Sequence, residues 1–271
     1  MPGSDLNEAA RNPGPSSHHL SALLTQAGFR HAFFTRQGGA SEGPFESLSF
    51  STAVGDREDH VEENLRRAGS VLGVPPERIV YLSQVHGTEA HFFTAPATRA
   101  QTITLEGDAV GGACAGHAYG VRSADCVPIL LADAGSGQVM AIHAGWRGVV
   151  AGVVEAGVER LRQSLGGDGR LIAAIGPHIS KRAFEVSEDV ALELSRSCPS
   201  PSSEVVTRKS GEKPRVDLRL IVTQKLLALG LPEASIDQVG GCTWRSPELY
   251  FSFRRDGKRS GRHLSAIVPR A

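Results

Sequence analysis

Residues 123–165 read SADCVPILLADAGSGQVMAIHAGWRGVVAGVVEAGVERLRQSL, and this stretch indicates the kind of fold. It contains two short apolar segments, 127–132 and 138–143, separated by a turn rich in glycine and serine. Continuously apolar segments of this length are typical of strands that are covered on both faces. Residues 149–165 follow with apolar side chains at helical spacing and stop at Gly166-Gly167. The stretch therefore predicts two buried strands and one helix.

The same two patterns continue along the rest of the chain. Helical spacing extends over residues 56–72, where Asp56 is expected to cap the helix, and over residues 217–229. Further strands are predicted at residues 32–34, 79–85, 90–94, 171–175 and 249–253. We therefore expect an α/β (α+β) layered sandwich with mixed β-sheets and outer helices.

Bulk properties are those of an ordinary globular protein. The chain has 271 residues, of which 40% are hydrophobic and 21% charged, so it is long enough for a substantial core. Residues 1–18 are rich in Pro, Gly, Ser and Asn and predict a flexible N-terminal tail. We expect residues 19–271 to form a single catalytic domain, with a surface excursion at 198–215.

Charge and hydropathy argue against some partners. The 29 basic and 29 acidic side chains balance, which removes the simplest argument for nucleic acid or a membrane surface as a partner. The basic segment 254–262 is expected to be hairpin-like, and a solvated edge is favoured over a nucleic-acid site. Apolar segments stay well below the ~20 residues of a membrane span, and no signal peptide is evident. We expect a cytoplasmic protein whose cysteines are thiols or metal ligands.

Three short segments place a reactive side chain beside turn-forming residues at the end of a predicted strand. They read SQVHG (83–87), SADCVP (123–128) and AIHAGWRG (141–148). His86 and His143 close their strands whereas Cys126 opens one, so adjacent or antiparallel strands could bring these ends together. Glycine beside a histidine lets backbone or ligand approach closely. The shared design indicates one site built from His86, Cys126 and His143.

Two imidazoles and one thiolate are the ligand set of a catalytic zinc, which leaves the fourth position open for water or substrate. The same residues could instead make a metal-free nucleophile pair, with Cys126 as thiolate and a histidine as base. A third interpretation makes all three buried structural side chains. Their spacing along the chain does not separate the first two interpretations, and their shared placement favours a functional role over the third.

Arg147 and Asp125 are candidate substrate-binding residues beside this set. Arg147 lies in the turn between the His143 strand and a helix, where free N–H groups and a guanidinium suit an anion such as phosphate. In a simpler interpretation Trp146 belongs to the core and Arg147 is an ordinary surface charge. Asp125 either orients a histidine or caps a turn.

Other positions are weaker candidates. Arg36, in the glycine-rich turn TRQGG (35–39), could reach a polar substrate or serve the turn alone. The segment EGDA (106–109) places a carboxylate in a turn, where capping is the commoner role. His178 is more often a structural histidine in such a position, and Cys242-Thr243-Trp244 is a pocket candidate of weak specificity.

These motifs resemble the laccase-domain family, whose YfiH-like members are also described as polyphenol oxidases, peptidoglycan-editing factors and purine nucleoside phosphorylases. The resemblance runs from Arg30 to Ile267, and ADC (124–126) followed by HAGWRG (143–148) is its most specific part. It further includes FFTRQGG (33–39), SQVHG (83–87), GDAV (107–110), IGP (175–177), CTW (242–244) and FSFRRDG (251–257). One departure is the segment HISKR (178–182), where many relatives carry cysteines.

The resemblance implies a zinc site at His86, Cys126 and His143 and a sandwich related to cysteine-hydrolase-like folds. It implies phosphorolysis of adenosine, inosine, guanosine and methylthioadenosine, with adenosine deamination as a further activity. Family members are also described as removing a wrong amino acid from a peptidoglycan precursor and as copper-dependent phenol oxidases. A multicopper oxidase needs several coppers, and the ten histidines of this chain include no His-X-His pair.

We therefore expect a zinc-dependent purine nucleoside phosphorylase. Cys126, His86 and His143 form its reaction centre, and Arg147 holds phosphate, with Arg36 as a second arginine. The alternatives are a hydrolase that edits a cell-wall precursor and a metal-stabilised binding protein without turnover. For either enzyme the partner is a small molecule.

Overall fold

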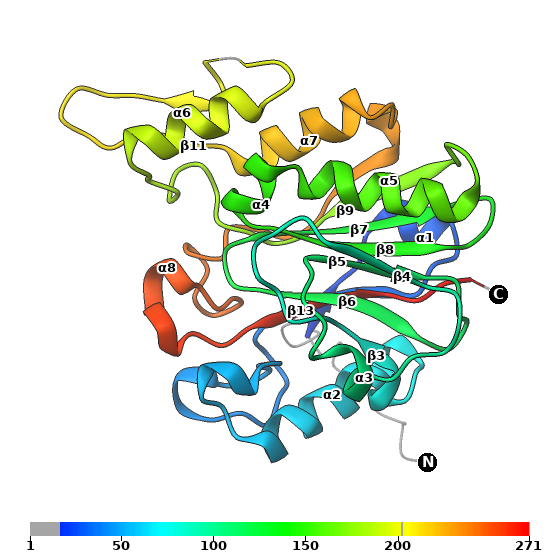
Figure 1. Cartoon of the computed structure of the whole chain (residues 1–271). Coiled ribbons are helices and arrows are strands. Elements are labelled where there is room, and N and C mark those ends of the chain that lie inside the picture. The colour runs from blue at the N-terminus through cyan, green and yellow to red at the C-terminus, as the bar shows by residue number, and fades with distance from the viewer. Residues whose placement is uncertain (1–16, 202, 271) are drawn as a thin grey trace, which may run out of the picture.

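The computed structural model describes residues 17–201 and 203–270, and these form a layered α/β sandwich (Figure 1). The five-stranded sheet has the order β1 (His18–His19), β2 (His31–Phe34), β13 (His263–Ile267), β6 (Ala118–Ser123) and β3 (Ile79–Val80). The six-stranded sheet has the order β12 (Ile236–Gln238), β9 (Leu171–Ile175), β7 (Val127–Asp133), β8 (Val139–Ala144), β5 (Ala109–Gly112) and β4 (Ala90–Phe93). Both sheets contain parallel and antiparallel neighbours, which confirms the predicted mixed sheets.

Helices cover the outer faces of the two sheets (Figure 1). On the six-stranded sheet lie α4 (Trp146–Ala151), α5 (Val153–Leu165) and α7 (Leu218–Ala228), with α6 (Glu188–Ser197) beside them. On the five-stranded sheet lies α2 (Glu58–Leu72), with α3 (Arg99–Thr102) near β3. The remaining elements are α1 (Ala22–Gln26), α8 (Phe253–Asp256), the β10 (Val206–Thr207) and β11 (Arg215–Val216) pair, and 3-10 turns at Gly43–Phe45, Thr52–Val54, Pro76–Arg78, Glu233–Ser235 and Gly257–Arg259.

The central strands are apolar throughout because each of their faces meets a different layer. Ile129 and Leu131 of β7 pack among the residues of α5 and α7, whereas Leu130 and Ala132 pack against the other sheet. All seven residues of β7 and all six of β8 are buried. Burial of such side chains stabilises the fold by roughly 1.5–3 kcal/mol for each large one. The predicted continuous apolar strands are confirmed here.

The helix predicted over residues 149–165 is wrong as a single element. The chain forms α4 and α5, which are separated at Gly152, whose φ of 99° lies in the left-handed region. A glycine adopts this conformation without the steric cost of a Cβ atom. The first of these helices, α4, begins at Trp146, shortly after the strand that carries His143.

The segment from residue 249 to 262 also differs from its prediction. Residues 249–253 form no strand, and residues 254–262 form no hairpin; α8 and a 3-10 turn occupy this region instead. Ser252 caps α8, since its hydroxyl accepts a hydrogen bond from the Arg255 N–H. The local capping interaction therefore overrides the strand propensity of the aromatic residues.

Other boundaries shift by a few residues. The strand predicted at 79–85 is limited to Ile79–Val80, with an isolated bridge at Ser83. Asp56 does not cap α2, because its carboxylate accepts from Ser41 Oγ and from the N–H of Arg57, the residue before the helix. Of the predicted tail, residues 1–16 lie outside the described residues, and His18 belongs to β1.

Within the described residues, no helix has the length and apolar character required to span a membrane.

Candidate active site

Antiparallel pairing of β7 and β8 brings two of the three predicted site residues together. In this pair Val127 lies opposite Ala144 and Pro128 opposite His143. Cys126, just before β7, is therefore beside the end of β8. His86 reaches the same place from the turn after Ser83, with a φ of 60°. A positive φ is uncommon for a residue other than glycine and often marks a functional site.

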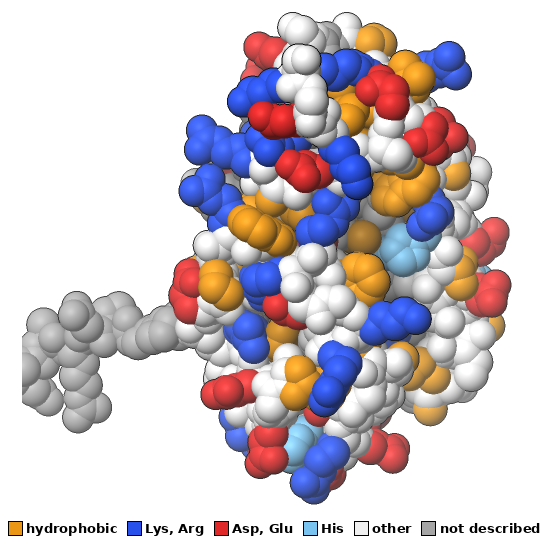
Figure 2. All heavy atoms as spheres, turned by 90° about the vertical axis from the view of Figure 1, so that its left-hand side faces the viewer, with side chains coloured by type: hydrophobic (Ala, Val, Ile, Leu, Met, Phe, Trp, Pro, Cys, Tyr) orange, Lys and Arg blue, Asp and Glu red, His pale blue; other side chains and the backbone are white. Residues whose placement is uncertain are grey.

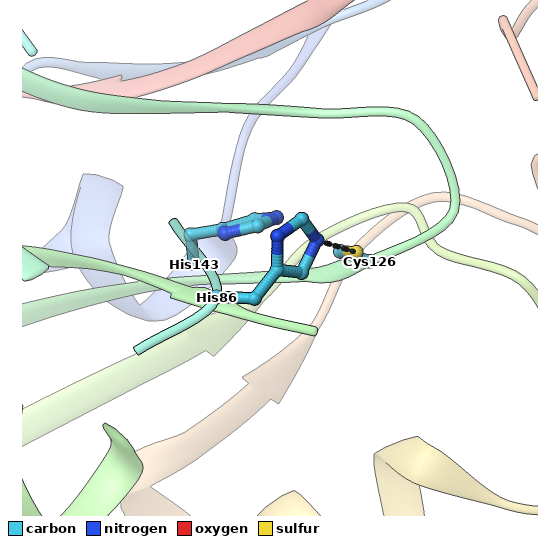
Figure 3. A group of neighbouring side chains, drawn as sticks. All are labelled: His86, Cys126 and His143. Atoms are coloured by element: carbon cyan, nitrogen blue, oxygen red, sulfur yellow. Dashed lines mark hydrogen bonds between the residues drawn. The ribbon is translucent and has the colours of Figure 1, made fainter. Parts of the chain in front are cut away.

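The donor atoms of these three side chains converge (Figure 3). Cys126 Sγ lies 3.8 Å from His86 Nε2, and all three donor atoms lie within 4.8 Å of one another. The rings of His86 and His143 are 4.9 Å apart between centroids and tilted by 71°. His143 is buried, Cys126 is half-buried and His86 is exposed, so the group is open to solvent on one side.

Asp108 orients the ring of His143 and holds the backbone on both sides of His86. His143 Nδ1 donates to Asp108 Oδ1 at 2.8 Å, which directs Nε2 towards Cys126. Asp108 Oδ2 accepts from the N–H groups of Gly87 (2.6 Å) and Val85 (3.2 Å), on either side of His86. Burial would raise the pKa of Asp108, but these hydrogen bonds and the nearby imidazole outweigh burial and lower it. The sequence suggested only a capping role for this turn.

The electrostatics of the group favour a thiolate beside an imidazolium. Burial raises the pKa of Cys126, but the charges and hydrogen bonds of His143 and His86 outweigh burial and lower it to about 6. Burial lowers the pKa of His143, but the Cys126 thiolate and Asp108 raise it to about 9. The thiolate is the form of cysteine that ligates metals and attacks electrophiles.

The residues present fit a zinc ion. Two imidazole nitrogens and a thiolate, with one histidine held by a carboxylate, form a donor set that zinc prefers. Gly145 keeps the group compact, because a Cβ atom there would lie 2.5 Å from His86 Cδ2 and 3.1 Å from Cys126 Sγ. In the part of the chain that is described, these residues form the one such cluster, so there is no set for several coppers.

A cavity of about 620 Å³ opens beside the cluster. Its walls carry four arginines (Arg122, Arg147, Arg254, Arg262) and three aromatic residues (Trp146, Phe184, Phe253). Figure 2 looks onto the side of α8 and α6, where Lys and Arg side chains gather around a hollow with a histidine at its edge. Asp125 is the one carboxylate among the lining residues. The cavity is therefore suited to a ligand with negative charge.

The predicted substrate-binding residues lie in different places. Arg147 lines the cavity, is exposed and stacks on Trp146, with its guanidinium carbon 4.5 Å from the ring centroid. Asp125 accepts from Thr243 Oγ1 (2.5 Å), Ser252 Oγ (2.9 Å) and the Arg254 N–H (2.6 Å). Asp125 thus fastens a distant loop and makes no hydrogen bond to His86 or His143.

Arg36 and the weaker candidates are outside the cavity lining. Arg36 donates to the carbonyl oxygens of Glu46 (2.7 Å) and Pro247 (2.9 Å) and stacks on Phe251. His178 Nδ1 bonds to the Gly176 carbonyl oxygen. These contacts hold turns together. Conversely, Arg122 and Arg262 line the cavity although no motif in the sequence placed them there.

The chain is similar to known proteins over most of its length. The model of the family described as "Multi-copper polyphenol oxidoreductase laccase" matches residues 30–270. The chain belongs to this family.

Two named proteins and one solved structure are similar to this chain over most of their own length. A purine nucleoside phosphorylase of Streptomyces coelicolor is 38% identical over 233 residues, covering 86% of this chain and 92% of the relative. The purine nucleoside phosphorylase YfiH of Escherichia coli is 34% identical over 237 residues, covering 86% and 90%. The crystal structure of Bacillus licheniformis YfiH has a TM-score of 0.86 at 27% identity, covering 94% of this chain and 97% of that one. The relatives indicate an enzyme with a small-molecule substrate.

Proposed function

We propose that this protein is a zinc-dependent purine nucleoside phosphorylase that acts on adenosine, inosine, guanosine and methylthioadenosine. The observation that carries the proposal is the convergence of His86, Cys126 and His143 at a cavity lined by arginines and aromatic residues. The names of the relatives support the same activity. We further propose that the protein works in the cytoplasm, with small molecules rather than nucleic acid or a membrane as its partners.

His86 Nε2, Cys126 Sγ and His143 Nε2 would hold the zinc. When bound there, zinc supplies a Lewis acid for a leaving group or for water. Asp108 keeps His143 in the tautomer whose Nε2 lone pair faces the cluster. The aromatic walls of the cavity, with Phe253 48% exposed, offer stacking surfaces to a purine.

Phosphorolysis also requires an anion held close to the sugar. A phosphate oxygen forms a bond to C1′ of the ribose while the C1′–N9 bond breaks, and its electron pair leaves with the base. The base takes up a proton, and ribose 1-phosphate is the second product. Arg147 at the cavity wall is our candidate for neutralising the phosphate, because it has no carboxylate partner in the described part of the chain.

A paired measurement tests the proposal. We expect about one zinc per chain and phosphate-dependent release of free base from adenosine and inosine, both lost in Cys126→Ala. The matched control is Cys114→Ala, a half-buried cysteine outside the cavity lining, which should keep both properties. Folded wild-type protein that turns over no nucleoside would contradict the proposal.

The low pKa of Cys126 favours a second candidate chemistry, a metal-free nucleophile paired with His143. Cys126 would then attack the carbonyl carbon of an amide, as in removal of an amino acid from a peptidoglycan precursor. The C–N bond breaks, the amine leaves with a proton from His143, and water hydrolyses the resulting thioester to regenerate the thiol. Activity that survives complete removal of zinc by a chelator would favour this candidate.

Adenosine deamination, measured as ammonia release, is a further activity that we assign to the same site. For the metal-free candidate we also propose that the fold is related to cysteine-hydrolase-like folds.

A protein without turnover is the remaining alternative. In that case Cys126→Ala would lower thermal stability by removing a metal ligand and would remove no activity, because there would be none to remove.

A further inference from the structure

Two arginines of the cavity wall are half-buried and lack an acidic partner. Arg122 is in β6 and Arg262 directly precedes β13, and both line the cavity. Within residues 17–201 and 203–270, no carboxylate oxygen lies within 4.0 Å of either guanidinium. Charged groups removed from water are usually paired, because an unpaired one loses hydration without compensation. Something else is therefore expected to balance these two charges.

Arg122 is held in place by contacts that leave most of its donors free. The Gln84 side chain bonds to both the N–H (2.8 Å) and the carbonyl oxygen (2.7 Å) of Arg122, which fastens β6 to the His86 segment. Its guanidinium stacks on Tyr81 at 4.3 Å and, among the described residues, donates one hydrogen bond, to the carbonyl oxygen of Leu82 at 3.3 Å. A guanidinium has five N–H donors, so most of them can serve a ligand.

Arg262 is held in a similar way. Its Nη1 donates to the carbonyl oxygens of Ser260 (2.6 Å) and Gly261 (3.0 Å), and its guanidinium lies over Phe253. The hydrogen bonds found for the Arg262 side chain in the described residues come from Nη1 alone, so Nε and Nη2 stay available. These two nitrogens form one edge of the fork that binds an oxyanion in a bidentate manner.

The two guanidinium groups line the same cavity as Cys126. In the pairing of β13 with β6, His263 lies opposite Ser123, which brings Arg262 and Arg122 to the same end of the sheet. Burial and the charge of Arg122 lower the pKa of Arg262, whereas the charges of the Cys126 thiolate and, more weakly, of Asp125 raise it. Two like charges that line one cavity repel, and an anion bound between them would relieve the repulsion.

We propose that Arg122 and Arg262 form an oxyanion seat beside Cys126 that binds a phosphate group. This seat is distinct from Arg147, which is exposed and lies on the helix after β8. The phosphate is either inorganic phosphate or a monoester on the ligand. The inference rests on the proposed function only for the choice of phosphate as the oxyanion.

Calorimetric titration of the purified wild-type protein with inorganic phosphate, adenosine 5′-monophosphate and adenosine tests the seat without any turnover. We expect Arg122→Gln and Arg262→Gln each to weaken phosphate-group binding at least tenfold. Arg270→Gln is the matched control and should bind as wild type does. Arg270 is also half-buried, donates to two carbonyl oxygens and stacks on an aromatic ring, but it lies outside the cavity lining.

The ligands separate the two sources of phosphate. Saturable binding of inorganic phosphate, with no advantage of the monophosphate over adenosine, identifies a co-substrate seat and moves the phosphate of the proposed reaction from Arg147 to Arg122 and Arg262. A seat for a phosphate ester is identified if wild type binds the monophosphate more tightly than adenosine. This difference in affinity must then be lost in both Arg122→Gln and Arg262→Gln. The seat does not exist if wild type binds neither anion, or if both glutamine variants bind as tightly as wild type.

Two further measurements keep the test decisive. Should a glutamine variant fail to fold, Arg122→Lys and Arg262→Lys keep the charge but lose the fork, and weaker phosphate binding is again expected. Base release is assayed separately, so the two proposals can fail independently. If wild type turns over no nucleoside but both glutamine variants bind phosphate groups more weakly than wild type, the proposed function alone is wrong. If wild type turns over nucleosides and both glutamine variants bind phosphate groups as tightly as wild type, the oxyanion seat alone is wrong.

Discussion

Asp108 Oδ1 accepts a hydrogen bond from His143 Nδ1 at 2.8 Å, and both side chains are buried. The other oxygen of the same carboxylate holds the backbone on both sides of His86. One acidic side chain thus links the two histidines of the cluster. Their relative position therefore depends on a residue that need not touch a metal or a substrate.

Asp108→Asn is expected to lower the affinity for zinc. The amide is a weaker acceptor than the carboxylate and does not enforce the same histidine tautomer, and loss of such a partner typically costs about 10- to 100-fold in metal affinity. Chelator competition measures this effect. The matched control is Asp133→Asn, a buried carboxylate that accepts from the N–H groups of Ser136 and Arg170. Equal zinc affinity for the two variants would contradict the role of Asp108.

Gly145→Ala is expected to disrupt the cluster. The added Cβ would lie 2.5 Å from His86 Cδ2, so the imidazole must move away from Cys126. We expect at least a tenfold loss of zinc affinity and a similar loss of turnover. Gly167→Ala provides the comparison, since a methyl group at that position would have nothing within 4 Å of it. A Gly145→Ala protein with wild-type zinc content would show that the site tolerates the crowding.

Asp125→Asn distinguishes the two roles that the sequence left open for this residue. Because its oxygens accept three hydrogen bonds from Thr243, Ser252 and Arg254, we expect a loss of about 1–3 kcal/mol in the free energy of unfolding. Asparagine tolerates the positive φ of 85° at this position, so backbone strain does not confuse the result. Urea unfolding and zinc titration are the measurements. A change in zinc affinity with unchanged stability would instead indicate that Asp125 orients a histidine.

His263 is expected to make the stability of the protein depend on pH. It accepts from the Phe251 N–H through Nε2, bonds to the Ser123 carbonyl oxygen through Nδ1, and is buried. Burial lowers its pKa from 6.5 to about 3, and the backbone bond to Ser123 only partly opposes this. Below pH 6.5 the unfolded chain takes up a proton that the folded protein does not. This stabilisation is therefore complete above pH 6.5 and is lost as the pH falls towards 3.

The variant His263→Gln removes this titration while keeping an acceptor and a donor. Between pH 6 and pH 4 its free energy of unfolding should fall less steeply than that of wild type, by at most about 1.4 kcal/mol per pH unit. Urea unfolding across this range measures the slope. An unchanged slope would mean that other groups account for the acid sensitivity.

Much of the fold and the identity of the cluster could be predicted from local pattern. The apolar segments around Leu130 and Ile142 predict buried strands because short, continuously apolar segments are typical of strands covered on both faces, and both residues are buried. The helix was misjudged at Gly152, since an isolated glycine within apolar periodicity is often tolerated. The strand expected near Phe251 was misjudged because capping by Ser252 and hydrogen bonds to Asp125 outweigh strand propensity there.

The sequence by itself determined the layered α/β class and singled out His86, Cys126 and His143, because residue type and periodicity are properties of short segments. The tertiary structure alone decided that Asp108 supports the histidines, that Asp125 fastens a distant loop, and that Arg122 and Arg262 lie together in the cavity. These relationships join residues that are tens of positions apart. They depend on strand pairing and on how the two sheets pack, and such contacts leave no periodic signal in one sequence.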